Sequence, residues 1–193
     1  MRTSFKQLAL AGVAAMTMTA GLAVPAEAQM RRERTVMVGG AAMYPSKTIV
    51  ENAVNSRDHT TLVAAVQAAG LAETLSGAGP FTVFAPTNQA FTRLPAGTVE
   101  TLLRPENRDQ LRGVLTYHVV PGRMVARDLM RAIRAGRGSA TLTTVQGGTL
   151  TARMRGRSIV LTDARGGVAT VTQADVLQSN GVIHVTNAVS IPS

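Results

Sequence analysis

The spacing of apolar residues changes near residue 140. Before this point they recur three or four positions apart, as Leu62 and Val66 do, which is the spacing of an amphipathic helix. After it they alternate with polar residues, as Leu150 and Ala152 do within residues 149–155, which is the spacing of a half-buried strand. Helices that precede an antiparallel run of strands predict one domain of the α+β class.

The helical part also carries residues that start and stop helices. Asp58 is a candidate N-cap for the first clear helix, and Gly70 suits a left-handed C-terminal cap. Phe81–Ala85 is apolar on both sides apart from one threonine, so it predicts a buried strand that Pro86 ends. We expect Thr87 to cap the helix that follows. The helices expected in this part cover residues 58–70, 87–91, 94–103, 105–115 and 124–137.

Strands dominate the remainder of the chain. The segment Gln146-Gly147-Gly148 lies between two alternating runs and predicts a hairpin, and the pair Asn180-Gly181 predicts the turn that opens the last strand. The expected strands cover residues 141–145, 149–155, 158–162, 168–172 and 181–191. Because short turns join them in order, they predict an antiparallel meander.

Residues 1–28 have the arrangement of a secretory signal peptide. A positive leader precedes the uncharged apolar stretch Leu8–Val24, and Ala26-Glu27-Ala28 supplies a cleavage site between small residues. An uncleaved anchor is the less favoured alternative, because the apolar stretch is short for a membrane span. We therefore expect residues 29–46 to be an N-terminal tail or extension and residues 47–193 to be a single domain. The mature chain, without a transmembrane span, is expected in the periplasm or the medium.

Charge and cysteine content narrow the possible functions. The formal net charge is +9, and nearly all of the 20 basic residues are arginine, because Lys6 and Lys47 are the only lysines. Without cysteine, the protein has no disulfide, no thiol nucleophile and no thiolate metal site. A basic surface attracts anionic polymers or lipid headgroups. Nucleic acid is not expected as a partner, because tryptophan is absent and few aromatic residues can stack on bases.

Three segments resemble the conserved blocks of the fasciclin (FAS1) domain family. They are GPFTVFAPTNQAF at residues 79–91, LTYHVVPG at residues 115–122 and SNGVIHVTNAVSIP at residues 179–192. They occur in the family's order, and the resemblance covers residues from about 48 to 192. It implies a FAS1-type wedge of two β-sheets packed against a layer of helices. It also implies a non-enzymatic role in cell adhesion or in contact with extracellular or envelope proteins or matrix.

Tyr117 and His118 lie where a helix is expected to pass into a strand. The favoured interpretation is structural: a partly buried imidazole that binds a backbone group and holds the following Pro-Gly turn in place. In animal members of the family this block is linked to integrin engagement, although the present chain has no Arg-Gly-Asp. The alternative is therefore a partner-binding surface formed by Tyr117, His118, Val119, Val120 and Pro121.

The other histidines do not point to catalysis. We expect His184 to be a strand residue whose ring is satisfied by a neighbour, and His59 to be a solvated residue in the first turn of a helix. The three histidines lack the paired spacing of metal ligands, and neither a nucleophile motif nor a phosphate-binding loop is present. The sequence predicts no enzymatic activity, no catalytic residue, no metal site and no cofactor.

Five arginines recur at helical spacing after the Tyr-His block. Arg127, Arg131 and Arg134 are expected on one face of a helix, with Arg123 before them and Arg137 after them. A solvated helix face is the simpler interpretation, but like charges four residues apart repel by about 0.2–0.5 kcal/mol per pair. We therefore hypothesise that these residues form a patch for anionic polysaccharide or lipid headgroups.

A carrier of an apolar small molecule, such as a carotenoid or lipid, is the alternative function. Some members of the wider family bind carotenoids. Methionines at positions 37, 43, 124, 130 and 154 provide adaptable apolar surface, although core packing explains most of them more simply.

Overall fold

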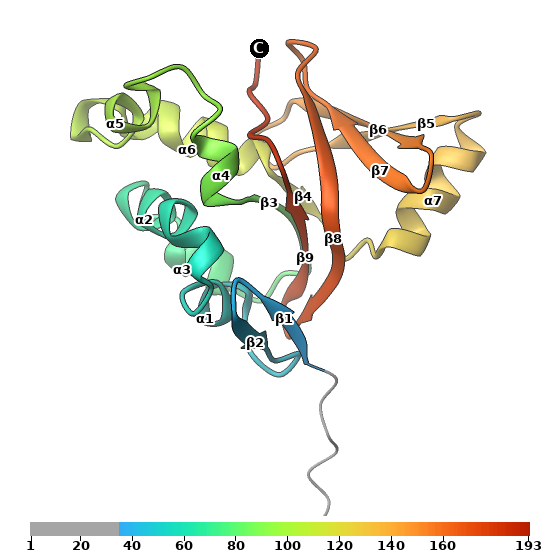
Figure 1. Cartoon of the computed structure of the whole chain (residues 1–193), viewed down its shortest axis with the longest axis horizontal. Coiled ribbons are helices and arrows are strands. Elements are labelled where there is room, and N and C mark those ends of the chain that lie inside the picture. The colour runs from blue at the N-terminus through green and yellow to red at the C-terminus, as the bar shows by residue number, and fades with distance from the viewer. Residues whose placement is uncertain (1–34) are drawn as a thin grey trace, which may run out of the picture. The chain divides into compact units, whose positions relative to one another are not determined.

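A seven-stranded sheet with helices on both of its faces forms the frame of the computed structural model, which describes residues 35–193 (Figure 1). The signal peptide expected at residues 1–28 lies outside the described residues. In spatial order the strands are β4 (Val119–Pro121), β3 (Phe81–Pro86), β9 (Gly181–Thr186), β8 (Val168–Gln178), β7 (Ser158–Thr162), β6 (Thr149–Arg155) and β5 (Ser139–Thr143).

The last five strands form the antiparallel meander that the sequence predicts. The strand β8 belongs to two groups, because it pairs with β7 through Val168–Thr170 and with β9 through Val171–Gln178. One pairing was not predicted: β3 lies parallel to β9, with Phe84 opposite His184. This pairing brings the middle of the chain beside its end. The α+β class expected from the sequence is confirmed.

Helices cover one face of β3 and β9 (Figure 1). Alternate strand residues, such as Val83 and Ala85 of β3 and Ile183 of β9, pack with them in one apolar core. Short 3-10 helices precede two of the helices, at Arg57–His59 and Pro105–Asn107. The helices of this layer are α1 (Ile49–Ala53), α2 (Thr60–Ala68), α3 (Ala72–Ser76), α4 (Asn88–Phe91), α5 (Thr98–Leu102) and α6 (Arg108–Tyr117).

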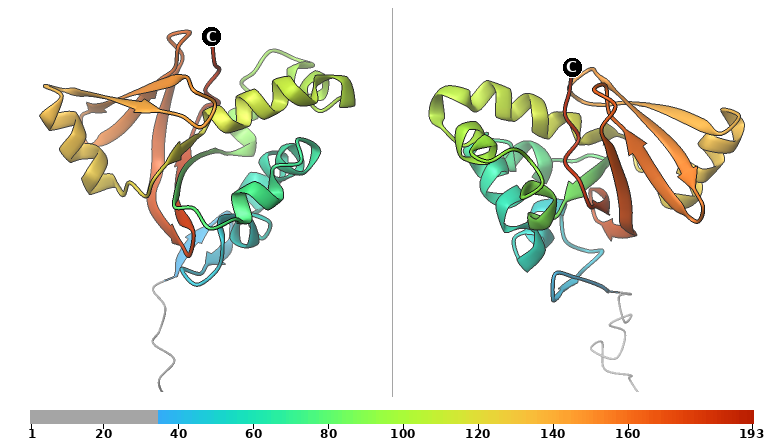
Figure 2. Two further views of the ribbon diagram at one scale, coloured as in Figure 1. Left: turned by 180° about the vertical axis from the view of Figure 1, so that it is seen from behind. Right: turned by 45° about the horizontal axis from the view of Figure 1, so that its top comes forward.

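The helix α7 (Ala126–Ala135) closes a second apolar core, on the other side of β3 (Figure 2). Its Leu129 and Ile133 are buried against the strands β5–β8, and Phe84 of β3 points into the same core. A carboxylate from β8 caps its start, because the Ala126 N–H donates to Asp175 Oδ1 at 2.6 Å. The amphipathic helix predicted at residues 124–137 is therefore present, with two residues fewer at each end.

Two of the three predicted caps are confirmed. The Ala90 N–H donates to the Thr87 hydroxyl at 3.3 Å, and Gly70 has a φ of +68°, in the left-handed region. The N-cap assigned to Asp58 is wrong, because this residue lies inside a 3-10 helix. The residue that precedes α2 is His59, and its side chain makes no capping hydrogen bond.

A small hairpin precedes the helical layer. Its strands β1 (Val36–Val38) and β2 (Ala41–Met43) lie within the segment expected to be a tail or extension. Val38 and Met43 are buried in the helical core, so residues 36–43 pack on the domain. Gly39 and Gly40 both have positive φ, which the tight turn requires and which only glycine adopts readily.

Candidate functional site

Tyr117 ends α6 with its ring fully buried in the α7 core. Its hydroxyl donates to the carbonyl of Thr149 at 2.6 Å and accepts from the N–H of Ala164 at 3.1 Å. Burial raises the pKa of this phenol above its ordinary value, although the bond from Ala164 acts in the opposite direction. The side chain thus ties the end of α6 to the start of β6 and to the loop after β7.

His118 follows at once and binds backbone on both sides of its ring. Nε2 accepts from the Ser190 N–H at 3.0 Å, so the ring proton lies on Nδ1, which donates to the Val114 carbonyl at 2.8 Å. Burial lowers the pKa of His118, while the Val114 carbonyl and the charge of Asp163 oppose the shift. The neutral imidazole therefore connects α6 to the C-terminal segment.

The predicted role for the His118 ring is thus correct in kind and different in detail. The Pro-Gly turn that it was expected to hold is fixed instead by Thr82, whose hydroxyl donates to the Gly122 carbonyl at 2.7 Å and accepts from the Met124 N–H at 2.9 Å. Thr82 was not identified from the sequence as a functional residue. Its position as the one polar residue in an otherwise apolar strand was the available signal.

The alternative interpretation, a partner-binding surface at this block, needs correction. Four of its five side chains are buried: Tyr117, His118, Val119 and Val120 are each at most 5% exposed. Pro121 alone is exposed. A partner cannot touch covered side chains, so Pro121 is the side chain of this block that the folded domain presents to a partner.

His184 lies in β9 at the centre of the sheet, and its ring is satisfied as predicted. Nδ1 accepts from the Asp175 N–H at 3.3 Å, and Nε2 lies 2.8 Å from the Met124 carbonyl, to which it donates. The ring stacks on Phe84 with centroids 5.6 Å apart. Burial lowers the pKa of His184, against the opposing effects of the Met124 carbonyl and Asp175.

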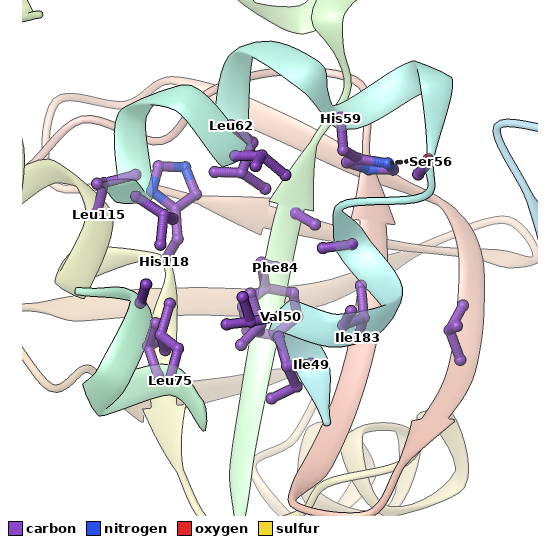
Figure 3. Close-up of a pocket in the computed structure, with 18 of the residues that line it drawn as sticks. Ile49, Val50, Ser56, His59, Leu62, Leu75, Phe84, Leu115, His118 and Ile183 are labelled. Carbon is purple, nitrogen blue, oxygen red and sulfur yellow. Dashed lines mark hydrogen bonds between the residues drawn. The ribbon is translucent and has the colours of Figure 1, made fainter. Parts of the chain in front are cut away.

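His59 corrects another expectation, because it is buried rather than solvated. Its Nδ1 lies 2.8 Å from the Ser56 hydroxyl, while Nε2 makes no hydrogen bond with the described residues (Figure 3). Burial lowers the pKa of this imidazole, and the Ala85 backbone and the Asp58 carboxylate oppose the shift.

The ring of His59 lines an apolar cavity between the helical layer and β3 (Figure 3). The space open to the centre of a water-sized sphere is about 60 Å³. A dry apolar cavity that takes up benzene measures about 150 Å³. The cavity is therefore too small for a carotenoid or a lipid chain, and it gives no support to the alternative function of an apolar carrier.

Two further features of residues 35–193 bear on other kinds of site. Histidine, aspartate and glutamate side chains nowhere gather in a group of three or more that could hold a metal ion. Likewise, no helix in this part of the chain has both the length and the apolar character of a membrane span.

The predicted arginine patch lies on and beside α7. Arg127, Arg131 and Arg134 are exposed on the side of α7 opposite its buried residues, and Arg137 is exposed just beyond the C-terminal end of the helix. Arg131 forms an ion pair with Asp128 of the preceding turn, at 3.4 Å.

Arg123 is the exception within this patch, because its guanidinium is held by the fold. It donates to the carbonyls of Gln178 and Ser179, both at 2.9 Å. The structure thus brings four of the five predicted arginines together on the surface, one of them, Arg131, paired with Asp128. It assigns the fifth to fastening the loop before α7 to the end of β8.

The fold and these contacts define a class of protein: a sheet-and-helix domain in which the buried polar side chains mostly bind backbone. The family model of the Fasciclin domain matches residues 57–192, and the chain belongs to this family. It is 46% identical over 173 residues to Protein sll1483 of Synechocystis sp., covering 89% of each chain. It is 33% identical to Immunogenic protein MPB70 of Mycobacterium bovis, covering 72% of the present chain and 66% of that protein.

A solved structure shares the fold at lower sequence identity. It is a FAS1 domain pair from the insect cell adhesion molecule Fasciclin I, with a TM-score of 0.66 and 17% identity. The match covers 75% of the present chain and 51% of that chain. The FAS1-type fold that the sequence resemblance implied is therefore confirmed, although β3–β9 form one continuous sheet rather than the expected two.

Proposed function

We propose that this protein is an exported, non-enzymatic contact module that presents the arginine face of α7 to anionic material outside the cytoplasm. The observation that carries the proposal is the set of exposed guanidiniums at Arg127, Arg131, Arg134 and Arg137. Exposed like charges at this spacing repel one another, and an anionic partner relieves that repulsion.

The placement of the other polar groups supports the proposal. The hydroxyl of Tyr117 and both ring nitrogens of His118 and His184 form hydrogen bonds with the backbone, so they are already occupied and do not face a substrate. The solved relative Fasciclin I is called a cell adhesion molecule, which is a contact function of the kind proposed. Cell adhesion, or contact with envelope or extracellular matrix, is the setting in which we expect the arginine face to act.

The proposal is tested by charge reversal on α7. The variant Arg127→Glu/Arg131→Glu/Arg134→Glu is compared with a control that has the same change in net charge on other surfaces, Arg93→Glu/Arg104→Glu/Arg112→Glu. All of these arginines are exposed, so both variants are expected to fold. The measurements are the salt concentration that elutes each protein from an anionic matrix and the amount retained on cells of the native host.

We expect the α7 variant to elute at much lower salt and to leave the cells, while the control stays close to the parent protein. Equal elution of parent and α7 variant contradicts the proposal. Export is tested separately by the intact mass of the protein recovered outside the cytoplasm. Cleavage after Ala28 removes residues 1–28, and a full-length mass contradicts the expected signal peptide.

A further inference from the structure

Positive charge is concentrated in one part of the sequence. Residues 47–117 carry six basic and six acidic side chains, which cancel. Residues 123–165 carry nine arginines against two aspartates, a net charge of +7. Both aspartates are engaged: Asp128 pairs with Arg131, and the buried Asp163 accepts from three backbone N–H groups. The arginines of this segment therefore remain in large excess, with Arg131 as the one that pairs with an aspartate of the same segment.

Part of this charge lies on a second row of arginines, in β6 and the turn after it. Arg153, Arg155 and Arg157 are exposed. Along β6, side chains alternate between the two faces of the sheet, and Leu150 and Ala152 point into the α7 core. Arg153 and Arg155 consequently lie on the sheet face that is turned away from α7. Arginines thus occupy both sides of this part of the sheet.

The two rows meet at one end of the sheet. Ser139 of β5 pairs with Arg153 of β6. Since β5 and β6 are antiparallel, Arg137, two residues before Ser139, lies at the same end as Arg155, two residues after Arg153. The C-terminal end of α7, the start of β5 and the turn between β6 and β7 lie at this end in both views (Figures 1 and 2).

We propose that the two rows form one continuous binding surface around this end of the sheet, and that its ligand is a linear acidic polysaccharide. We call this surface the arginine end. This inference rests on the proposed function and specifies its partner. The surface comprises Arg127, Arg131, Arg134, Arg137, Arg153, Arg155 and Arg157.

The geometry favours a flexible chain over a membrane. A bilayer is flat at this scale and meets one face of the sheet, so it leaves the other row in water. A linear polymer bends around the end and reaches both rows. Bilayer binding also gains from apolar side chains that insert between lipids. The large apolar residue exposed among these arginines is Met154, at 38% exposure.

The side-chain chemistry favours carboxylate or sulfate groups over single-stranded nucleic acid. A guanidinium binds a planar carboxylate through two parallel hydrogen bonds, and a polyuronate carries such a group on every sugar. Proteins that bind single strands add aromatic side chains on which bases stack. Residues 123–165 contain no Phe, Tyr or Trp. The arginine end therefore offers charge and hydrogen bonds without a stacking platform.

The test uses three double variants of the whole protein with equal changes in net charge. They are Arg131→Glu/Arg134→Glu on the helix row, Arg153→Glu/Arg155→Glu on the sheet row and the control Arg104→Glu/Arg112→Glu. Each is titrated with a soluble polyuronate at several salt concentrations. Vesicles containing anionic lipid and a DNA duplex serve as the other probes, and thermal melts check that the variants fold. If a Glu variant melts lower than the parent, the matching Arg→Gln pair repeats the measurement.

We expect each row variant to weaken polyuronate binding at least about tenfold at low salt and the control to change it less than about twofold. The slope of log K against log salt should fall by about two for each row variant, since roughly one counterion is released per contact. A sheet-row variant that binds like the control overturns the two-sided surface and leaves the proposed function standing. Equal weakening by all three variants overturns the two-sided surface, because net charge alone would then explain the binding.

The other two probes decide the identity of the partner. The polysaccharide is overturned as the ligand if the parent protein binds vesicles or duplex DNA more tightly than polyuronate at equal charge concentration. A parent protein that binds none of the three probes contradicts the proposed function as well. Preference for polyuronate, with both rows required, supports the inference.

Discussion

Acidification should destabilise this domain through its three buried histidines. His59, His118 and His184 each have a pKa that burial lowers below the ordinary value of 6.5. A neighbouring carboxylate opposes each shift: Asp58, Asp163 and Asp175, respectively. Burial is the larger effect in every case, so the folded protein holds all three imidazoles neutral at pH values where the unfolded chain protonates them.

The sign and size of the effect follow from proton linkage. Because the unfolded state binds more protons, the free energy of unfolding rises with pH. The stabilisation is complete above the unfolded pKa of 6.5 and is lost as the pH falls toward the lower pKa values of the folded state. At pH 5.5, a histidine that stays neutral in the folded protein lowers the free energy of unfolding by about 1.4 kcal/mol. Three such groups lower it by up to about 4 kcal/mol, a large part of the 5–15 kcal/mol typical of a domain.

Urea unfolding at about pH 7.5 and about pH 5.5, at constant ionic strength, measures this difference. Carboxylates with ordinary pKa values near 4 stay ionised throughout this range, so the change reports on the histidines. The matched variant is His59→Gln, which removes one titrating group at the site where Nε2 has no hydrogen bond to lose. It should reduce the loss of stability by about a third. A parent protein whose unfolding free energy changes by less than about 1 kcal/mol refutes the reasoning, as does a variant that keeps the full pH dependence.

Four further substitutions probe the fold by thermal or urea unfolding. Tyr117→Phe should lower the free energy of unfolding by about 0.5–1.5 kcal/mol, because the part-buried Thr149 carbonyl and Ala164 N–H lose their partner; no change would contradict a stabilising role for the hydroxyl. Gly70→Ala should destabilise the protein by at least about 1 kcal/mol, because φ is +68° and the new Cβ lies 2.3 Å from the Arg108 guanidinium. The control Gly113→Ala should stabilise it by about 0.5–1 kcal/mol, because this glycine lies inside α6 with open space around it. The same sign for both glycine changes would contradict this. Asn180→Ala should cost about 3 kcal/mol or more, since the side chain binds three backbone groups; a loss below about 1 kcal/mol would contradict that role.

Features fixed by neighbouring residues could be predicted from the sequence. The strand at Phe81–Pro86, the cap at Thr87 and the left-handed Gly70 depend on side chains a few positions away, and all three are confirmed. The hairpin of β1 and β2 also had a local signal, because Gly39-Gly40 lies between two short apolar runs. It was not identified because each strand has only three residues.

Features that depend on distant segments could not be predicted in this way. The parallel pairing of β3 with β9 joins residues about a hundred positions apart, and the spacing of apolar residues does not specify which strand lies beside which. The error at His59 has the same origin. Its place at the start of a helix indicated exposure, but the β1–β2 hairpin and β3 pack over that end and bury it.

For the candidate binding residues, too, local features could be predicted and long-range ones could not. The helical spacing of Arg127, Arg131 and Arg134 is local, and the structure places them on one exposed face, as predicted. The alternation within β6 likewise indicated that Arg153 and Arg155 share a face. That the two groups lie at the same end of the sheet depends on the pairing of β5 with β6 and on the position of α7. This relationship became visible only in the structure.

The Tyr-His pair explains how a domain without disulfides holds its two apolar cores in fixed positions relative to each other. The two residues are adjacent, yet the Tyr117 ring is buried in the α7 core and His118 lines the cavity of the helical core. Each binds backbone at a distance in sequence: the phenol at β6 and the loop after β7, the imidazole at the C-terminal segment. A substitution in the pair therefore acts first on stability, and any loss of binding that it causes should track the unfolded fraction. The arginine end contributes nothing to either core, so its side chains are free to vary with the partner while the fold stays the same.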